Sequence, residues 1–254
     1  MSWYSLLQHD HIYTFLLLFV RLSTLFVFLP FFNHMSVSPQ IKAAFAFYLT
    51  LVLYPIVPVT PEPNSLSLFF AAILSEMVMG LIAGVVLNIV FGMLAYAGEH
   101  IAFVMGFSLA RVVDPQTQIQ SPLVSQFLLL FAMVILLAFN GHYMILTWMA
   151  EAVKSAPLGG FVLQQEMFDY IINAMGHLFV MGLSIAFPII ALSLLSDIIF
   201  GMLMKTMPQF NLLVVGFPIK IMIALTVWLT VLGAMMMIFK EEFIAAINVL
   251  MQWL

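Results

Sequence analysis

Long apolar runs separated by short polar breaks dominate this sequence. A helix needs about 20 apolar residues to cross a bilayer, and most of the runs reach or exceed that length. The six runs extend over residues 12–32, 41–59, 66–97, 123–149, 170–203 and 212–239. Breaks rich in turn-forming residues lie at 33–39, 60–64, 157–160 and 206–211. The pattern therefore predicts an all-α chain built from hydrophobic helical hairpins of the membrane type, in one domain over residues 1–254.

Two of the runs, 66–97 and 170–203, are longer than a single crossing requires. Polar or helix-disturbing residues interrupt both of them: Glu76, Asn88, His177, Pro188 and Asp197. Gly80, Gly84 and Gly92 are separated by multiples of four, so we expect them to form a smooth ridge on one helix face. The helix that packs on this ridge can belong to the same chain or to another subunit.

The composition agrees with this pattern. Apolar residues make up 65% of the 254 positions and charged residues 7%, and the mean hydropathy is +1.18. Because this leaves too little polar surface to cover a soluble domain, lipid or other subunits must cover the chain. The sequence has no cysteine, which excludes disulfides and thiolate metal sites. Its net charge is -4 and its lysines and arginines are scattered, so nucleic acid is not an expected partner.

Sequence motifs for catalysis are missing. There is no HExxH for zinc, no GxSxG nucleophile turn and no phosphate-binding GxxxxGK[ST], and the histidines lack metal-ligand spacing. We therefore expect no enzyme activity, no cofactor and no metal site. His142 follows an apolar run at Asn140-Gly141-His142, so it either caps a helix end by donating to free carbonyls or makes a functional contact.

The stretch from Tyr96 to Pro115 is a polar interruption between two apolar runs. Glu99 lies at its start beside His100 and has no fixed basic partner nearby in the sequence, so it is a candidate either for a conformationally coupled carboxylate or for an intersubunit salt bridge. Farther on, Asp197 and Lys205 are eight residues apart and would share one face of a continuous helix as a polar seam. Pro208 to Asn211 would end that helix and begin the return segment.

Several short motifs occur in a fixed order. They are Gly98-Glu99, Met105-Gly-Phe-Ser-Leu-Ala110, Asp114-Pro115, Pro122, Asn140-Gly-His142, Asp197, Gly201, Pro208-Gln-Phe-Asn211 and Gly216-Phe-Pro218. Together they resemble the family of R subunits of the bacterial flagellar export gate, over nearly the whole chain. The T subunits of injectisome export gates are similar in pattern and remain a near alternative.

The resemblance implies a fused subunit, P-like over residues 1–165 and Q-like over 166–254, packed into a helical hetero-oligomer. Its expected partners are P-type and Q-type gate subunits, the B-type switch subunit, the large A-type gate protein and unfolded flagellar export substrates. The expected location is the bacterial inner membrane at the flagellar basal body, largely toward the periplasmic side. Polar groups of the long runs would then be satisfied across subunit contacts. The polar candidates are Glu76, Glu99, His142, Asp197, Lys205, Gln209 and Asn211.

The resemblance also implies that one segment projects into the pore as a plug, here called the pore segment. It comprises Met105, Gly106, Phe107, Ser108, Leu109, Ala110, Arg111, Val112, Val113, Asp114 and Pro115. Its apolar side chains offer a deformable seal against water and ions, and Gly106 provides backbone freedom for a turn. Arg111 and Asp114 are close enough to pair with each other or to reach a sister chain. The plain alternative is an interhelical loop.

An autonomous ion-coupled transporter is the alternative from another functional class. Ionisable groups inside apolar helices commonly mark ion paths in such proteins. The groups that would line the path here are Arg21, Glu76, Glu99, His177 and Asp197. This hypothesis predicts function without sister subunits.

Overall fold

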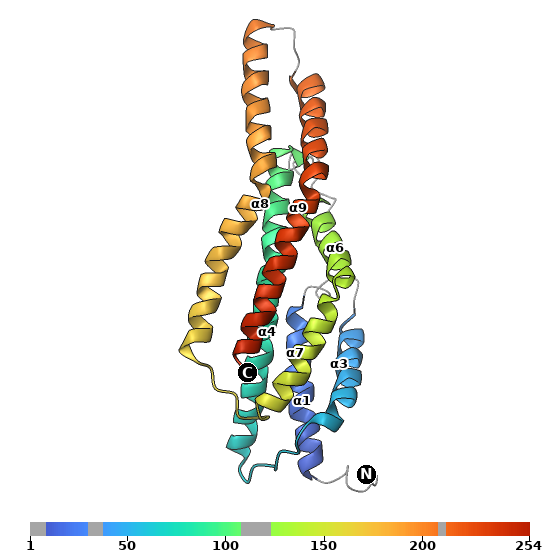
Figure 1. Ribbon diagram of the computed structural model, residues 1–254, viewed down its shortest axis with the longest axis vertical. Helices are drawn as coiled ribbons and strands as arrows, with labels where there is room; N and C mark the ends of the chain where they lie inside the picture. Colours follow the sequence, from blue (N-terminus) through green and yellow to red (C-terminus); the bar gives the residue numbers. More distant parts are fainter. Residues whose placement is uncertain (1–8, 30–37, 108–122, 208–211) are drawn as a thin grey trace. The chain divides into compact units, whose positions relative to one another are not determined.

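The protein is all helical in the computed structural model, which describes residues 9–29, 38–107, 123–207 and 212–254 (Figure 1). Seven α-helices lie in these residues: α1 (His9–Phe28), α3 (Pro39–Leu53), α4 (Leu66–Val104), α6 (Leu123–Ala138), α7 (Gly141–Ser155), α8 (Gln165–Thr206) and α9 (Phe217–Gln252). A short 3-10 turn, η2 (Tyr54–Ile56), follows α3, and a π-helical turn, η3 (Leu212–Gly216), precedes α9. The predicted all-α class is confirmed for the described residues.

Each apolar run corresponds to helix, but the fourth run is broken. The helices α6 and α7 meet at a bend of 69°, where Asn140 adopts a left-handed conformation with φ of 61°. Asparagine tolerates this conformation better than most residues and commonly ends helices in it. Among the described residues, five helices are long and apolar enough to cross a membrane, or up to six if the bent pair counts as one span. The chain is thus a membrane protein with several candidate spans.

Three helices are much longer than one bilayer crossing. α4 has 39 residues, α8 has 42 and α9 has 36. At 1.5 Å per residue such helices reach roughly 54 to 63 Å, whereas the hydrocarbon core of a bilayer is about 30 Å thick. Pro188 lies within α8 without ending it, and α8 stops just before the predicted break at Pro208. Much of each long helix must therefore meet something other than hydrocarbon, or lie at a steep tilt.

The described residues form two compact units. Unit 1 is drawn from residues 1–89, 139–174 and 243–254, and unit 2 from 90–138 and 175–242. The three long helices α4, α8 and α9 contribute to both units. The predicted halves, 1–165 and 166–254, remain a prediction.

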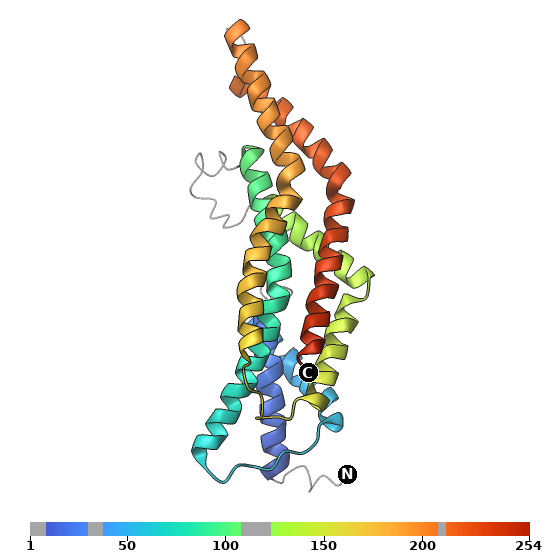
Figure 2. The ribbon, with the colours of Figure 1, turned by 60° about the vertical axis from the view of Figure 1, so that its left-hand side comes forward.

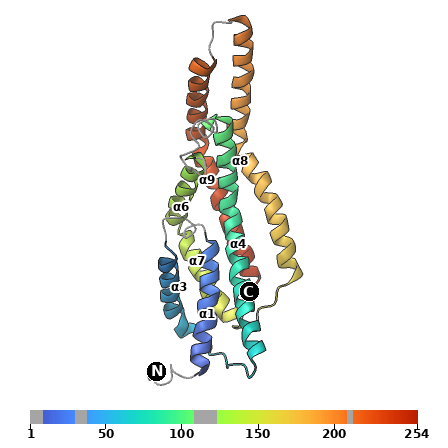
Figure 3. The same ribbon diagram turned by 180° about the vertical axis from the view of Figure 1, so that it is seen from behind.

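Unit 1 contains α1, α3, α7 and the first part of α4. Aromatic contacts join α1 to α3, with Phe15 and Phe47 ring centroids 5.4 Å apart in an edge-to-face arrangement. Leu17 and Leu18 of α1 and Leu87 of α4 are fully buried. Figure 3 shows α1 beside α3 and α4 from behind. Apolar burial between these helices forms the core of the unit.

Glycine allows α1 and α4 to approach closely in unit 1. A Cβ added at Gly80 would lie 2.5 Å from the carbonyl oxygen of Arg21, and one at Gly84 would lie 2.6 Å from Cβ of Phe28. The ridge at Gly80 and Gly84 therefore packs within the chain. Gly92 was expected on the same face, and this was wrong, because it lies against Leu178 of α8 instead. Twelve residues rotate a helix by about 120° beyond whole turns, which moves Gly92 off the ridge.

Unit 2 contains the second part of α4, all of α6, α8 from Met175 to its end and α9 from its start to Glu242. Here α8 and α9 run antiparallel (Figure 2). Phe91 of α4 and Phe239 of α9 are in edge-to-face contact, with ring centroids 5.0 Å apart. On α6, Ser125 donates its hydroxyl to the Ala95 carbonyl of α4 at 3.1 Å. The pore segment begins at the end of α4 in this unit.

Candidate functional site

The pore segment begins with a tight turn at the end of α4. The backbone N–H of Met105 donates to the Ile101 carbonyl at 3.0 Å, and that of Gly106 donates to the Phe103 carbonyl at 3.1 Å. Gly106 then adopts a φ of +85°, which glycine reaches without the strain that a side chain would cause. The structure thus gives Gly106 the turn that the sequence predicted.

Met105 is the first residue of the pore segment. The sequence predicts it on the sealing surface, and in the structure its side chain is fully buried. A long, flexible methionine side chain fills irregular core space well, so burial here favours an anchoring role. Phe107 is half-buried. The remaining members of the segment lie outside the described residues: Ser108, Leu109, Ala110, Arg111, Val112, Val113, Asp114 and Pro115.

Two side chains of unit 2 contact the end of α4. Ser193 of α8 donates its hydroxyl to the Val104 carbonyl at 2.8 Å. The ring of Phe217, the first residue of α9, faces Gly106, where an added Cβ would lie 3.3 Å from Cε1 and 3.4 Å from Cδ1. The sequence identified Gly216-Phe-Pro218 only as a motif and predicted no contact for Phe217. It gave no indication of Ser193. Neither contact has a signal in the sequence beyond the motif itself.

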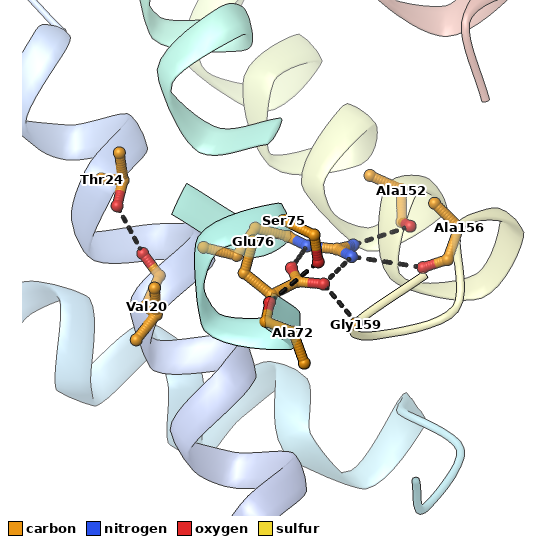
Figure 4. Close-up of polar contacts among 9 residues, drawn as sticks. Val20, Thr24, Ala72, Ser75, Glu76, Ala152, Ala156 and Gly159 are labelled. Carbon is orange, nitrogen blue, oxygen red and sulfur yellow. Dashed lines mark hydrogen bonds and ion pairs between the residues drawn. The ribbon is translucent and has the colours of Figure 1, made fainter. Parts of the chain in front are cut away.

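Glu76 lies in a separate polar site inside unit 1 (Figure 4). Its carboxylate pairs with Arg21 of α1, through Nε to Oε2 and through Nη2 to Oε1 at 3.1 Å. The side chains of Arg21 and Glu76 are 4% and 0% exposed. The Gly159 N–H also donates to Oε1 of Glu76, at 2.6 Å. Both charges are thus neutralised and hydrogen-bonded in the protein interior, as buried charges require.

Arg21 connects the same site to the end of α7. Its Nη1 donates to the Ala152 carbonyl at 3.0 Å, and its Nη2 donates to the Ala156 carbonyl at 3.3 Å. The last carbonyls of a helix have no partner within the helix, so a cation is favourable there. Glu76 was expected to be satisfied across a subunit contact, and this was wrong, because its partners belong to its own chain.

Glu99 and His142 remain open candidates. Glu99 is exposed on α4, and it makes no ion pair with any residue that the structure describes. His142 lies in the first turn of α7, and its Nδ1 is buried without a hydrogen-bond partner among the described residues. A capping bond from Nδ1 is therefore not observed there. The left-handed Asn140 accounts for the end of α6 instead.

Asp197 pairs with a lysine that sequence reasoning overlooked. Lys220 Nζ of α9 donates to both carboxylate oxygens of Asp197 of α8, at 2.7 and 2.8 Å. The lysine side chain is 9% exposed and the aspartate side chain 53%. Lys205 is on the same continuous helix as Asp197, as predicted, and is exposed. Gln209 and Asn211 lie outside the described residues. The signal that could have found Lys220 is its isolation, since it begins a long uncharged stretch of α9.

A second cross-helix pair lies at the other end of this hairpin. Nε2 of His177 in α8 is 3.1 Å from Oε1 of Glu242 in α9. His177 was a candidate for an ion path, whereas Glu242 was not singled out from the sequence. Asp197, Lys220, His177 and Glu242 all belong to unit 2, and together they define the antiparallel register of α8 against α9.

Comparison with known proteins agrees with these features. Residues 12–246 match the family described as bacterial export proteins, family 1. The flagellar biosynthetic protein FliR of Bacillus subtilis is 30% identical over 236 residues, which are 90% of each chain. FliR of Escherichia coli is 29% identical over 82% of this chain and 78% of its own. FliR of Aquifex aeolicus is 27% identical over 87% of this chain and 86% of its own. The chain therefore belongs to family 1 of the bacterial export proteins, the family that includes the flagellar FliR proteins.

Proposed function

We propose that this chain is a structural and gating subunit of a bacterial flagellar type III protein export gate. It assembles with P-type and Q-type subunits into the channel for unfolded flagellar proteins. The observation that carries the proposal is the family match over residues 12–246, because it takes in all or nearly all of every described helix. The flagellar names of the relatives compared above favour a flagellar gate over the injectisome alternative.

Exposed apolar helix faces support assembly with other subunits. In the apolar windows of both α8 and α9, only 28% of the residues are buried. Exposed members include Phe187 and Met202 of α8 and Met222 and Leu229 of α9. Because these helices are too long for one crossing, lipid alone cannot cover them without a steep tilt. Sister subunits of similar helical character would cover the remainder.

The pore segment supplies the gating part of the proposal. Its described beginning has the features that a plug requires: a buried anchor at Met105, a glycine turn at Gly106 and an aromatic side chain at Phe107. Apolar constrictions can exclude water and ions and still part around a polypeptide. The segment from Gly106 to Pro115 would thus close the idle channel.

The wider assignment follows the same resemblance. The B-type switch subunit and the large A-type gate protein are the further partners. The proposed location of the subunit is the inner membrane at the flagellar basal body, with much of the subunit on the periplasmic side. We expect it to catalyse no reaction.

The ion pairs favour a gate subunit over an autonomous transporter. Arg21 and Glu76 form an ion pair in the interior of unit 1, and Asp197 forms an ion pair with Lys220 in unit 2. The described pairs act as links between helices.

Native mass spectrometry tests the assembly. The tagged chain would be co-expressed with the neighbouring membrane-protein genes and purified in mild detergent. We expect one copy within a larger particle that contains P-type and Q-type subunits. A stable isolated monomer or homodimer from the same co-expression would contradict the proposal and favour the transporter. The neighbouring genes also distinguish a flagellar from an injectisome copy.

Deletion of residues 106–114 tests the plug. We expect the gate to assemble with unchanged subunit ratios and to leak ions or small solutes, because the apolar seal is gone. The measurement is ion flux in cells or liposomes, normalised to assembled gates. An assembled deletion variant that stays ion-tight would refute the seal.

A further inference from the structure

One carboxylate lies on the exposed apolar side of the α8–α9 hairpin. Asp197 is the only charged residue in the sequence from 178 to 204, and Lys220 is the only one from 217 to 239. The two form an ion pair in which the lysine side chain is buried and the aspartate side chain is half-exposed. The pair therefore presents its carboxylate, and not its ammonium group, to whatever covers α8.

The surroundings of Asp197 on α8 are apolar. Leu194 lies three residues before it and shares its helix face. Ile198 follows it directly, and both of these apolar side chains are exposed. Ile223 of α9 is exposed as well, three residues after Lys220. The carboxylate thus lies in the middle of an exposed apolar patch.

Gly201 adds a place where another helix can come close. It lies four residues after Asp197, so it shares a helix face with the carboxylate. An added Cβ at Gly201 would meet none of the described atoms within 4 Å, whereas one at Gly80 or Gly98 would collide with a neighbouring helix of the same chain. Small residues on an open helix face let the backbone of a partner helix approach closely.

Neither lipid nor water suits this patch alone. Hydrocarbon would leave the exposed side of the Asp197 carboxylate without hydrogen bonds, which is energetically costly. Water would solvate the carboxylate but would leave the apolar side chains around it exposed, and contiguous apolar patches with a polar element are typical of interaction sites. An apolar helix that carries a hydrogen-bond donor opposite Asp197 satisfies both parts.

The ion pair also determines the charge of the partner side chain. Lys220 already neutralises Asp197, with bonds to both of its oxygens. An arginine or lysine of the partner would add a further, uncompensated charge to a site that loses its water. A carboxylate has about four acceptor positions, so Asp197 can accept a bond from a neutral hydroxyl or amide group beside those from Lys220.

We propose that Asp197 and Gly201 form a docking site on α8 for an apolar helix of a sister gate subunit. The helix carries a neutral donor, which is serine, threonine, asparagine or glutamine, opposite the carboxylate. This inference rests on the proposed assembly with sister subunits. It adds the position on α8 where one of them binds and the chemistry by which the position is recognised.

The first test separates the acceptor of Asp197 from its ion pair. Asp197→Asn with Lys220→Met removes both charges and keeps an acceptor oxygen, whereas Asp197→Leu with Lys220→Met removes the acceptor too. Native mass spectrometry of co-expressed gates at rising detergent concentration measures the retention of sister subunits. We expect the variant with asparagine to retain them nearly as wild type does, and the variant with leucine about tenfold less, the effect of one hydrogen bond. Equal retention in the two double variants would overturn the inference.

The matched control removes an exposed ion pair from another helix. Glu151 and Lys154 of α7 are both exposed, so Glu151→Leu with Lys154→Met should retain the sister subunits as wild type does. Equal loss from this control and from the variant with leucine at 197 would reduce the effect to general loosening and would also overturn the inference.

Gly201→Leu tests the open space beside Asp197. The added Cβ meets no described atom of the chain, and leucine favours helix more than glycine does, so the chain itself should not be destabilised. The larger side chain should nevertheless keep the partner helix at a distance, and we expect retention to fall at least as far as with leucine at 197. Wild-type retention of the sister subunits by Gly201→Leu would contradict the docking site.

A photoreactive phenylalanine analogue at position 198 identifies the partner directly. We expect adducts with an apolar helix of a sister subunit, with a neutral donor residue within one turn of the adduct. Adducts with lipid alone, with a second copy of this chain or with another segment of the same chain would overturn the inference, as would an arginine or lysine in place of the neutral donor. If wild type forms no particle with P-type and Q-type subunits, the proposed function falls together with this inference. If the particle forms and every variant retains all its subunits, this inference alone falls.

Discussion

Arg21 and Glu76 place opposite charges in the interior of unit 1, and neither is solvated there. Their mutual attraction alone does not compensate the loss of water around two ions. The bonds to the Ala152 and Ala156 carbonyls and from the Gly159 N–H occupy further donor and acceptor positions of the two side chains. The pair therefore joins α1, α4 and the turn after α7 into one polar site, and its stability depends on both members being present.

Removal of one member of the pair Arg21 and Glu76 should destabilise the protein more than removal of both. Glu76→Leu leaves the Arg21 cation buried without a counter-ion, and we expect a loss of about 3–5 kcal/mol of stability. The double variant Arg21→Met with Glu76→Leu should lose less than Glu76→Leu alone. Thermal denaturation of purified gates that contain wild type, Glu76→Leu or the double variant ranks the three proteins by stability.

The exposed pair Glu151 and Lys154 provides the control, with side chains that are 48% and 54% exposed. Glu151→Ala should leave the denaturation midpoint close to wild type, because exposed pairs contribute little. If the double variant lost as much stability as Arg21→Met and Glu76→Leu lose when their separate effects are added, the two charges would not act as a pair.

The sequence indicated that the charges of Arg21 and Glu76 are energetically costly inside apolar runs, but it could not show that the two side chains form an ion pair. They are 55 residues apart, with α3 and two breaks between them. A charge in an apolar run signals only the need for a partner. Gly159 could not have been found at all, since its contribution comes from the backbone. For the pore segment, the turn at Gly106 was predictable from residue type, whereas the burial of Met105 depends on distant helices.

At the scale of elements, glycines decide which helices come closest to α4. Gly98 lies against the backbone of Ser125 in α6, where an added Cβ would be 2.8 Å from the serine nitrogen and 2.9 Å from its Cβ. Gly182 of α8 lies in the same way against α4, where an added Cβ would be 2.9 Å from the Met93 carbonyl oxygen. Backbone contacts of this kind replace the hydrophobic driving force that is weak between helices in lipid.

Gly98→Ala should separate α4 from α6, because a backbone cannot rotate away as a side chain can. We expect a loss of about 1–3 kcal/mol, the usual cost of overpacking. At Gly233 of α9 an added Cβ meets nothing within 4 Å, so Gly233→Ala should be neutral or should stabilise by up to about 1 kcal/mol. The thermal midpoints of the two variants measure the difference. A Gly98→Ala protein as stable as Gly233→Ala would contradict the close contact.

The hydrophobic pattern of the sequence predicted the positions of the helices well, but it did not predict their bends. Each of the six runs contains helix within the described residues, and α8 ended where Pro208 predicted. The bend between α6 and α7 was missed because the residues on both sides of it are apolar. Asn140-Gly141 is a turn signal that could have marked it. The pairing of Asp197 with Lys220 instead of a seam with Lys205 depended on the register of α9, which no local pattern sets.

At the scale of the whole molecule, the chain exposes more apolar surface than one bilayer explains. Exposed apolar residues on α8 extend from Phe179 to Met202, a distance of roughly 35 Å along the helix. Exposed apolar residues continue on α9 from Ile219 to Met237. Under the proposed function, sister subunits cover a large part of these faces, and the remainder meets lipid.

Photo-cross-linking can establish what covers these faces. A photoreactive phenylalanine analogue would replace Phe187 of α8 or Met222 of α9, whose side chains are 62% and 69% exposed. When the sister genes are co-expressed, we expect covalent adducts with P-type or Q-type subunits, because helices of similar apolar character pack face to face in the gate. The same positions without sister genes provide the control and should give no such adducts. Adducts with lipid alone in a fully assembled gate would show that the bilayer covers α8 and α9, and that these helices cross the membrane at a steep tilt.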